Sequence, residues 1–186
     1  FGHARGGDIR LLQTIGAKLS FSVVAVPPVT VDGETVSSSA IRTAIEGGDV
    51  TRARALLGRP FAVTGEVVRG EGRGRVLDFP TANVAVDNET VPCRGVYVTE
   101  TLAFGSRFPS ITNVGVRPTF GGATLSVESH LIDVEEDLYG ERVEVRFLAR
   151  LRDEVKFAGP AELADQLARD QAAATSYFSG LTLARY

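Results

Sequence analysis

Residues 61–75 read FAVTGEVVR followed by GEGRGR, and the character of the chain changes at this stretch. Its first part is rich in β-branched and aromatic residues, which is typical of a strand, and its second part is a glycine-rich turn. The same alternation of apolar runs and turns recurs downstream and predicts further strands at 95–104, 108–114, 125–133 and 142–149. Five or six such strands can close into a small antiparallel barrel.

The sequence after the last of these strands predicts a helix. Pro160 suits a first helical turn, where its missing N–H costs nothing. An apolar stripe follows it at Leu163, Leu167, Ala174 and Tyr177. We expect this stripe to pack on the outside of the barrel.

The residues before the barrel have the mixed pattern of an α/β domain. We predict a helix at 8–19, an apolar strand at 21–26, a hairpin at 29–36 with its turn at Asp32-Gly33, a helix from the serines at 37–39 to Gly47-Gly48, and a helix that Asp49 caps and Gly58 ends. The boundary is expected near Arg59-Pro60, which gives domains 1–58 and 59–186.

Composition excludes several classes of protein. The 186 residues carry Lys+Arg 20 against Asp+Glu 23, a formal charge of −3, so no basic field is available to hold nucleic acid. No apolar run approaches the roughly 20 residues that span a bilayer, and a single cysteine fits a reducing cytoplasm. The chain begins with Phe1 and contains no methionine, which we interpret as part of a longer protein.

The glycine-rich turn has the composition of an anion site. Gly72 and Gly74 allow the backbone to approach an anion closely, while Arg73 and Arg75 add positive charge. Both features suit a polyphosphate. A flexible surface turn with solvated arginines has the same composition, and this pattern alone favours that alternative.

The residues just after this turn carry candidate metal ligands. Pro80 favours extended backbone, so the side chains of Thr81 and Asn83 point the same way. A hydroxyl and an amide oxygen are hard ligands, and Mg²⁺ that is held mainly by phosphates and water needs only one or two of them. The alternative is a strand edge with ordinary polar residues.

The predicted strand at 125–133 carries a candidate general base. Strict alternation places Glu128 and His130 on one face, and Leu125, Val127 and Leu131 on the other, which we expect to face inward. A carboxylate can accept the proton of an alcohol during phosphoryl transfer. A lone glutamate on a half-exposed strand is nevertheless more often structural.

Together, GRGR at 72–75 and FPTAN at 79–83 resemble the glycine-rich loop and the Pro-Thr-Ala-Asn motif of riboflavin kinases. DLYG at 137–140 resembles the turn that follows the glutamate-bearing strand in that family. The resemblance implies an α+β fold: a six-stranded antiparallel Greek-key-type β-barrel with a C-terminal helix. It also implies transfer of the ATP γ-phosphate to the 5′-hydroxyl of riboflavin, which yields FMN and ADP.

The same resemblance implies a role for each site residue. Thr81 and Asn83 hold Mg²⁺ and the ATP phosphates, beside Pro80 and the loop 72–75, and Glu128 accepts the hydroxyl proton. Arg152 contacts the flavin within a mobile segment at 151–157, and the segment 113–120 is a loop bordering the nucleotide. Asp78 stands where the family usually has glycine.

The upstream residues resemble the other half of bifunctional riboflavin kinase/FAD synthetases. FGHARGGD at 1–8 and VSSSAIR at 36–42 are similar to parts of its FMN adenylyltransferase, a partial α/β nucleotidyltransferase domain in this chain. The family's His-x-Gly-His motif is absent from the sequence, so we expect FMN rather than FAD as the product. The alternatives are an adenylyltransferase that the barrel merely supports, and a non-catalytic flavin-binding module.

Overall fold

The computed structural model describes residues 7–70, 79–119, 122–134 and 136–183. The chain divides into two compact units, Phe1–Val36 and Ser37–Tyr186. The glycine-rich residues Gly72, Arg73, Gly74 and Arg75, together with Asp78, lie outside the described residues.

The first unit contains one helix and one hairpin. Helix α1 (Ile9–Leu19) begins where the Asp8 carboxylate accepts a hydrogen bond from the Leu11 N–H at 2.8 Å. Strands β1 (Thr30–Val31) and β2 (Glu34–Thr35) are joined by Asp32 and Gly33, whose φ angles of 50° and 81° suit a tight hairpin turn. The predicted helix and hairpin are therefore confirmed.

The strand predicted at 21–26 is wrong, because residues 21–29 form no strand. Val24 and Val26 are 83% and 81% exposed. A strand exists only where another strand satisfies its backbone N–H and C=O groups, and no described segment pairs with this one. An apolar run therefore predicts a strand only when a partner is in place.

Two short helices open the second unit at the predicted residues. Helix α2 (Ser38–Glu46) follows the Ser37 N-cap, and α3 (Val50–Leu57) follows the Asp49 N-cap and ends at Gly58, which has φ 71°. Both helices belong to the same compact unit as the barrel, and Val50 joins its core. The assignment of residues 1–58 to an adenylyltransferase remnant stays a prediction.

Six strands form the closed barrel that the sequence predicts. They are β3 (Phe61–Val68), β4 (Ala82–Val86), β5 (Gly95–Ala103), β6 (Ser106–Thr119), β7 (Gly122–Leu131) and β8 (Arg142–Arg152). Their order around the barrel is β3-β4-β7-β6-β5-β8, and every pair is antiparallel. Because β8 returns to lie beside β5, strands β5 to β8 form a Greek key.

Two strand predictions need correction. Strand β4 was not among the predicted strands, although extended backbone was predicted around Pro80, just before it. Strand β6 runs on to Thr119, so residues 113–119 are strand and not the nucleotide-bordering loop that the resemblance implied. Pairing with β7 explains the extension, because its register runs from Ser110 to Thr119, beyond Val114, where pairing with β5 ends.

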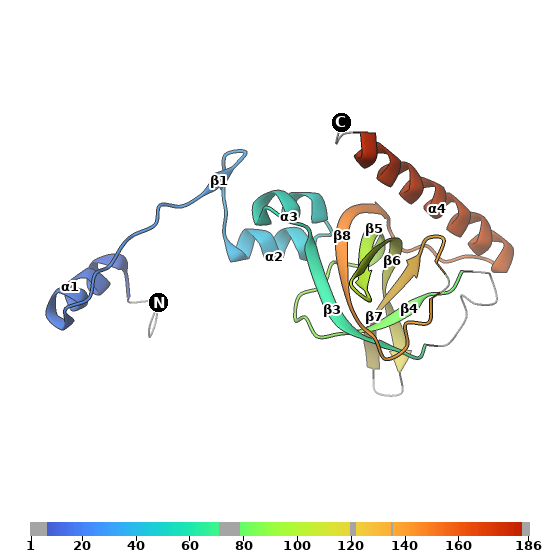
Figure 1. Cartoon of the computed structure of the whole chain (residues 1–186), viewed down its shortest axis with the longest axis horizontal. Helices are drawn as coiled ribbons and strands as arrows, with labels where there is room; N and C mark the ends of the chain where they lie inside the picture. The colour runs from blue at the N-terminus through green and yellow to red at the C-terminus, as the bar shows by residue number, and fades with distance from the viewer. Residues whose placement is uncertain (1–6, 71–78, 120–121, 135, 184–186) are drawn as a thin grey trace. The chain divides into compact units, whose positions relative to one another are not determined.

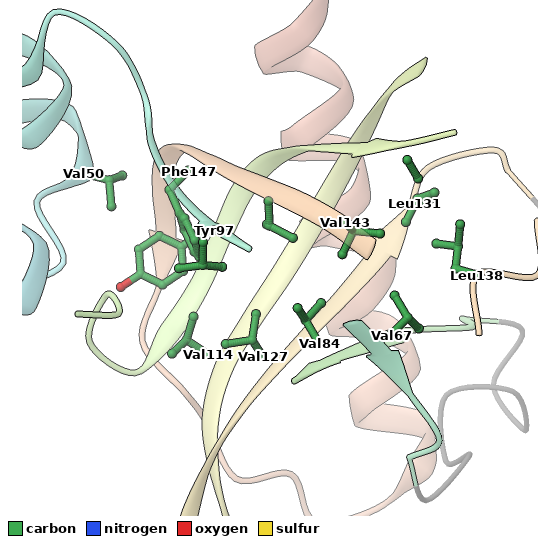
Figure 2. Close-up of a cluster of buried hydrophobic side chains, with 13 residues drawn as sticks. Val50, Val67, Val84, Tyr97, Val114, Val127, Leu131, Leu138, Val143 and Phe147 are labelled. Carbon is green, nitrogen blue, oxygen red and sulfur yellow. The ribbon is translucent and has the colours of Figure 1, made fainter. Parts of the chain in front are cut away.

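The apolar core fills the inside of the barrel (Figure 2). Val67, Val84, Val127 and Val143 point into the middle, while Val50 of α3 lies at the end near Tyr97 and Phe147. Leu138, from the turn after β7, lies at the opposite end of the cluster. The barrel is thus a filled core, so a ligand site must lie outside it or at its ends.

Five buried hydroxyls form a closed ring among these apolar side chains. Thr99 bonds Ser110 at 2.9 Å and Thr112 at 2.7 Å, and Thr101 bonds Ser110 at 2.8 Å and Ser129 at 2.9 Å. Thr112 donates to Ser129 at 3.1 Å and completes the ring. Each hydroxyl has two ring neighbours, so each can donate one hydrogen bond and accept one.

The long C-terminal helix covers one outer face of the barrel (Figure 1). Helix α4 (Pro160–Leu183) contributes Leu167, Ala174 and Tyr177 to a second apolar cluster. The barrel contributes outward-facing Val96, Val98, Ile111 and Leu148 to it. The prediction that this helix packs on the outside of the barrel is confirmed. Among the residues that the structure describes, no helix is long and apolar enough to cross a membrane.

Candidate active site

The register of the barrel sets the polar residues of interest in one row. Asn83 on β4 is opposite Glu128 on β7, and Glu128 is also opposite Asn113 on β6. Asn113 is opposite Val96 on β5, which is opposite Arg152 on β8. Directly opposite residues lie on the same face of an antiparallel pair. Because Val96 belongs to the outer cluster, the whole row lies on the outer face.

A cavity of about 330 Å³ lies over this row. Its walls come from the outer barrel face, the residues before β4, the segment after β8 and helix α4. They are Phe79, Thr81, Val96, Ile111, Asn113, Glu128, His130, Arg152, Glu154, Val155, Phe157, Leu163, Leu167 and Asp170. A largely apolar wall with a few convergent polar groups suits a small organic molecule that has a polar end.

Thr81 and Glu128 meet in this cavity. The Thr81 hydroxyl donates to Oε2 of Glu128 across 3.5 Å, and both side chains are part-buried. The strand alternation predicted for β7 is confirmed, because Val127 and Leu131 are 2% and 6% exposed in the core while Glu128 and His130 face the cavity. The prediction that Leu125 also faces the core is wrong, because its side chain is 45% exposed.

Asn83 lies beside this pair but outside the lining of the cavity. Its side chain packs on Gly70, where an added Cβ would lie 2.2 Å from Nδ2 of Asn83. Only glycine at position 70 leaves room for the amide. The structure therefore brings Thr81 and Glu128 together and places Asn83 as the next residue in the row, toward the end of β3.

The hydroxyl of Thr81 and the amide oxygen of Asn83 are ligand types that suit a hard divalent cation. Among the described residues, no group of three or more His, Cys, Asp or Glu side chains could hold a metal ion alone.

Arg152, the predicted flavin contact, forms an ion pair in the cavity wall. Its Nε and Nη2 donate to the Asp170 carboxylate at 3.0 and 2.7 Å, and its guanidinium lies 5.9 Å from the centre of the Phe157 ring. Asp170, on α4, is 4% exposed and also accepts from Gln166 at 2.8 Å. The contact of Arg152 with flavin stays a prediction.

Asp170 escaped the sequence reasoning although a signal was present. It lies three residues after Leu167 and four before Ala174, inside the apolar stripe of α4. A carboxylate in such a stripe is buried and needs a charged partner. Finding the partner required the fold, because Arg152 lies 18 residues away on a strand.

The segment after β8 lies over the cavity. Glu154, Val155 and Phe157 line it. An added Cβ on Gly115 would lie 2.5 Å from Oε1 of Glu154, so the glycine allows this carboxylate to approach β6 closely. That the segment 151–157 closes over a flavin stays a prediction.

His130 and Pro80 interact on the other side of the cavity. Nδ1 of His130 lies 2.8 Å from the Pro80 carbonyl oxygen, and the imidazole stacks on the Phe79 ring with centroids 3.5 Å apart. Burial lowers the pKa of His130, against opposing contributions from the Pro80 carbonyl and Asp133. The ring is therefore neutral at pH 7.

Comparison with known proteins identifies the family. The family model described as riboflavin kinase matches residues 57–178. The chain is 40% identical over 183 residues to a bifunctional riboflavin kinase/FMN adenylyltransferase of Escherichia coli, covering 98% of this chain and 58% of that protein. A Bacillus subtilis protein of the same name is 39% identical over 160 residues, covering 84% and 51%.

A solved structure shares the fold. The crystal structure of a macrolide-efflux protein from Streptococcus pneumoniae matches with a TM-score of 0.83 and 35% identity, covering 94% of this chain and 57% of that chain. The chain thus spans little more than half the length of the proteins it matches. The six-stranded Greek-key barrel and the Thr81–Glu128 pair in its outer cavity agree with the family model. Because that model matches most of the barrel unit, the chain belongs to the riboflavin kinase family.

Proposed function

We propose that the barrel unit is an ATP-dependent riboflavin kinase, which transfers the γ-phosphate of ATP to the 5′-hydroxyl of riboflavin. The observation that carries the proposal is the approach of the Thr81 hydroxyl to the Glu128 carboxylate, 3.5 Å apart in one cavity. The family match and the names of the relatives support the same reaction.

The roles of the residues follow from their chemistry. Glu128 accepts the proton of the 5′-hydroxyl as the new O–P bond forms, and the bond between the γ-phosphorus and the β,γ-bridging oxygen breaks to release ADP. Thr81 and Asn83 would hold Mg²⁺, which when bound neutralises charge on the phosphates. The arginines of the loop 72–75 are proposed to contact the same phosphates.

The apolar wall of the cavity suits the ring system of a flavin. Phe79, Ile111 and Phe157 present aromatic and aliphatic surface, while the polar pair of Thr81 and Glu128 lies at one side. A flat aromatic ring with a polar alcohol chain matches this division. The segment 151–157, which includes Arg152, is proposed to cover the bound ring.

The test is incubation with riboflavin, ATP and Mg²⁺, with FMN and FAD separated by chromatography. Glu128→Gln keeps the shape of the side chain and removes the base, so we expect FMN formation to fall by about 10²–10⁴-fold. Glu66→Gln on the exposed part of β3 is the matched control and should leave the rate unchanged. A wild-type chain that makes no FMN, or a Glu128→Gln variant of full activity, would refute the proposal.

The same experiment separates the alternatives. An adenylyltransferase would convert FMN to FAD, and a flavin-binding module would bind flavin without dependence on ATP or Mg²⁺. We expect FMN alone from this chain, and propose that adenylyl transfer belongs to a longer protein, as the names of the relatives suggest. A reducing cytoplasm is the proposed location, in keeping with one free cysteine, Cys93.

A further inference from the structure

His130 holds the two residues that precede Thr81. Its ring stacks on Phe79 at an interplanar angle of 20°, and its Nδ1 lies 2.8 Å from the Pro80 carbonyl oxygen. His130 and Phe79 are 7% and 8% exposed, so the stacked rings are shielded from water. The His130 side chain therefore contacts two consecutive residues, Phe79 and Pro80.

The hydrogen bond fixes the tautomer of the imidazole. A carbonyl oxygen only accepts, so Nδ1 must carry the hydrogen. In the neutral ring Nε2 is then unprotonated. The ring thus acts as a donor toward Pro80 in its resting state.

The placement of Thr81 depends on these contacts. Strand β4 begins at Ala82, so Thr81 precedes the ladder of backbone hydrogen bonds. Pro80 has no N–H with which to join the sheet. His130 ties residues 79 and 80 to β7, the strand that also carries Glu128 two residues earlier. Phe79 also packs in the outer apolar cluster, whereas the Pro80 carbonyl bonds to His130.

We propose that His130 is a positioning residue for phosphoryl transfer, which fixes Phe79 and Pro80 so that the Thr81 hydroxyl faces Glu128. It acts through Thr81 and does not take a proton from the substrate. This inference rests on the proposed kinase activity. On this proposal, strand β7 aligns both groups: it carries the proposed base, Glu128, and through His130 it positions the proposed metal ligand, Thr81.

A double-mutant cycle with Thr81 tests the inference. His130→Phe keeps an aromatic ring for the stack on Phe79 but removes the hydrogen bond. Pro80 is exposed, so its carbonyl can turn to water and the fold should survive. We expect kcat/KM for Mg·ATP to fall about 10–100-fold, as for a catalytic group displaced by up to an ångström. His130→Asn, which retains an N–H near the position of Nδ1, should recover part of the loss.

The decisive comparison is made in the Thr81→Ala background. If His130 acts through Thr81, either His130 substitution should lower kcat/KM by less than about threefold further, because the group it positions is already gone. A full additional loss would overturn the inference.

Two controls keep the inference separate from the proposed function. If the wild-type chain forms no FMN, the proposed kinase activity is wrong, but the contacts of His130 with Phe79 and Pro80 are not affected. The ¹⁵N chemical shifts of the His130 ring test these contacts directly, because a protonated Nδ1 and an unprotonated Nε2 are expected in the wild-type protein. The opposite tautomer would overturn the inference whatever the activity. Circular dichroism shows whether each variant is folded, and His130→Asn replaces His130→Phe in the cycle if the latter is not.

Discussion

The ring of five hydroxyls inside the barrel predicts the effect of Thr101→Val. Valine has nearly the shape of threonine but lacks the hydroxyl, which bonds Ser110 at 2.8 Å and Ser129 at 2.9 Å. Because Thr112 donates to Ser129, the hydroxyl of Ser129 must donate to Thr101, and Thr101 to Ser110. The substitution therefore leaves one buried donor without an acceptor and one buried oxygen without a donor.

The magnitude follows from this count. A buried polar group that loses its partner costs about 1–3 kcal/mol, and the added methyl group recovers about 0.8 kcal/mol of this. For two such groups the net loss should be about 1–5 kcal/mol, centred on about 3 kcal/mol, or roughly 6–12 °C in melting temperature for a unit of this size. Ser129→Ala added to Thr101→Val should cost little more, because the shortened chain of hydroxyls again has one unpaired donor and one unpaired oxygen.

Urea unfolding followed by far-ultraviolet circular dichroism provides the measurement, since the chain has no tryptophan. Thr124→Val, at an exposed position on β7, is the matched control and should change the free energy of unfolding by less than about 0.5 kcal/mol. If Thr101→Val is as harmless as the control, or if the losses of Thr101→Val and Ser129→Ala simply add, the closed ring is not what stabilises this part of the core.

Three further predictions concern the cavity. Asp170→Asn leaves the charge of the part-buried Arg152 without its partner, so it should lower the free energy of unfolding by about 3 kcal/mol in urea titration, whereas Asp165→Asn on the exposed side of α4 should have no effect. Gly70→Ala displaces the Asn83 amide, so it should weaken Mg·ATP binding in isothermal calorimetry and leave riboflavin binding unchanged. If the variant binds Mg·ATP as tightly as the wild type does, this prediction is wrong. Burial lowers the pKa of His130 in the folded state. As the pH falls, His130 of the unfolded chain therefore takes up its proton at a higher pH than His130 of the folded chain. Stability is therefore complete above the ordinary pKa of about 6.5 and falls as the pH drops from there toward the folded pKa, and His130→Phe should remove this part of the slope in urea titrations at about pH 5 and 7.5.

Local features of the structure were predictable from the sequence because local chemistry determines them. Ser37 and Asp49 cap helices through their own side chains, and Gly58 ends α3 in a left-handed conformation that glycine adopts without strain. The alternation in β7 correctly separated Glu128 from Val127, because successive side chains of a strand point to opposite faces. None of these assignments needs a distant residue.

The same local signals were insufficient at 21–26 and at β4. The first is apolar enough for a strand but has no described partner, whereas Ala82–Val86 is short and becomes a strand because β3 and β7 lie on either side of it. Backbone pairing is a property of two segments, so one segment cannot reveal it.

Alternation along the sequence predicted on which face of its strand Glu128 lies, whereas only the tertiary structure determined which residues lie beside it. The register of the barrel sets Asn83, Glu128, Asn113 and Arg152 in one row, and a one-residue slip would turn a whole strand to the other face. The partner of Arg152 and the grip of His130 on Pro80 join residues 18 and 50 positions apart. Side-chain type and spacing fix the local conformation, whereas the site depends on contacts that exist only once the barrel has closed.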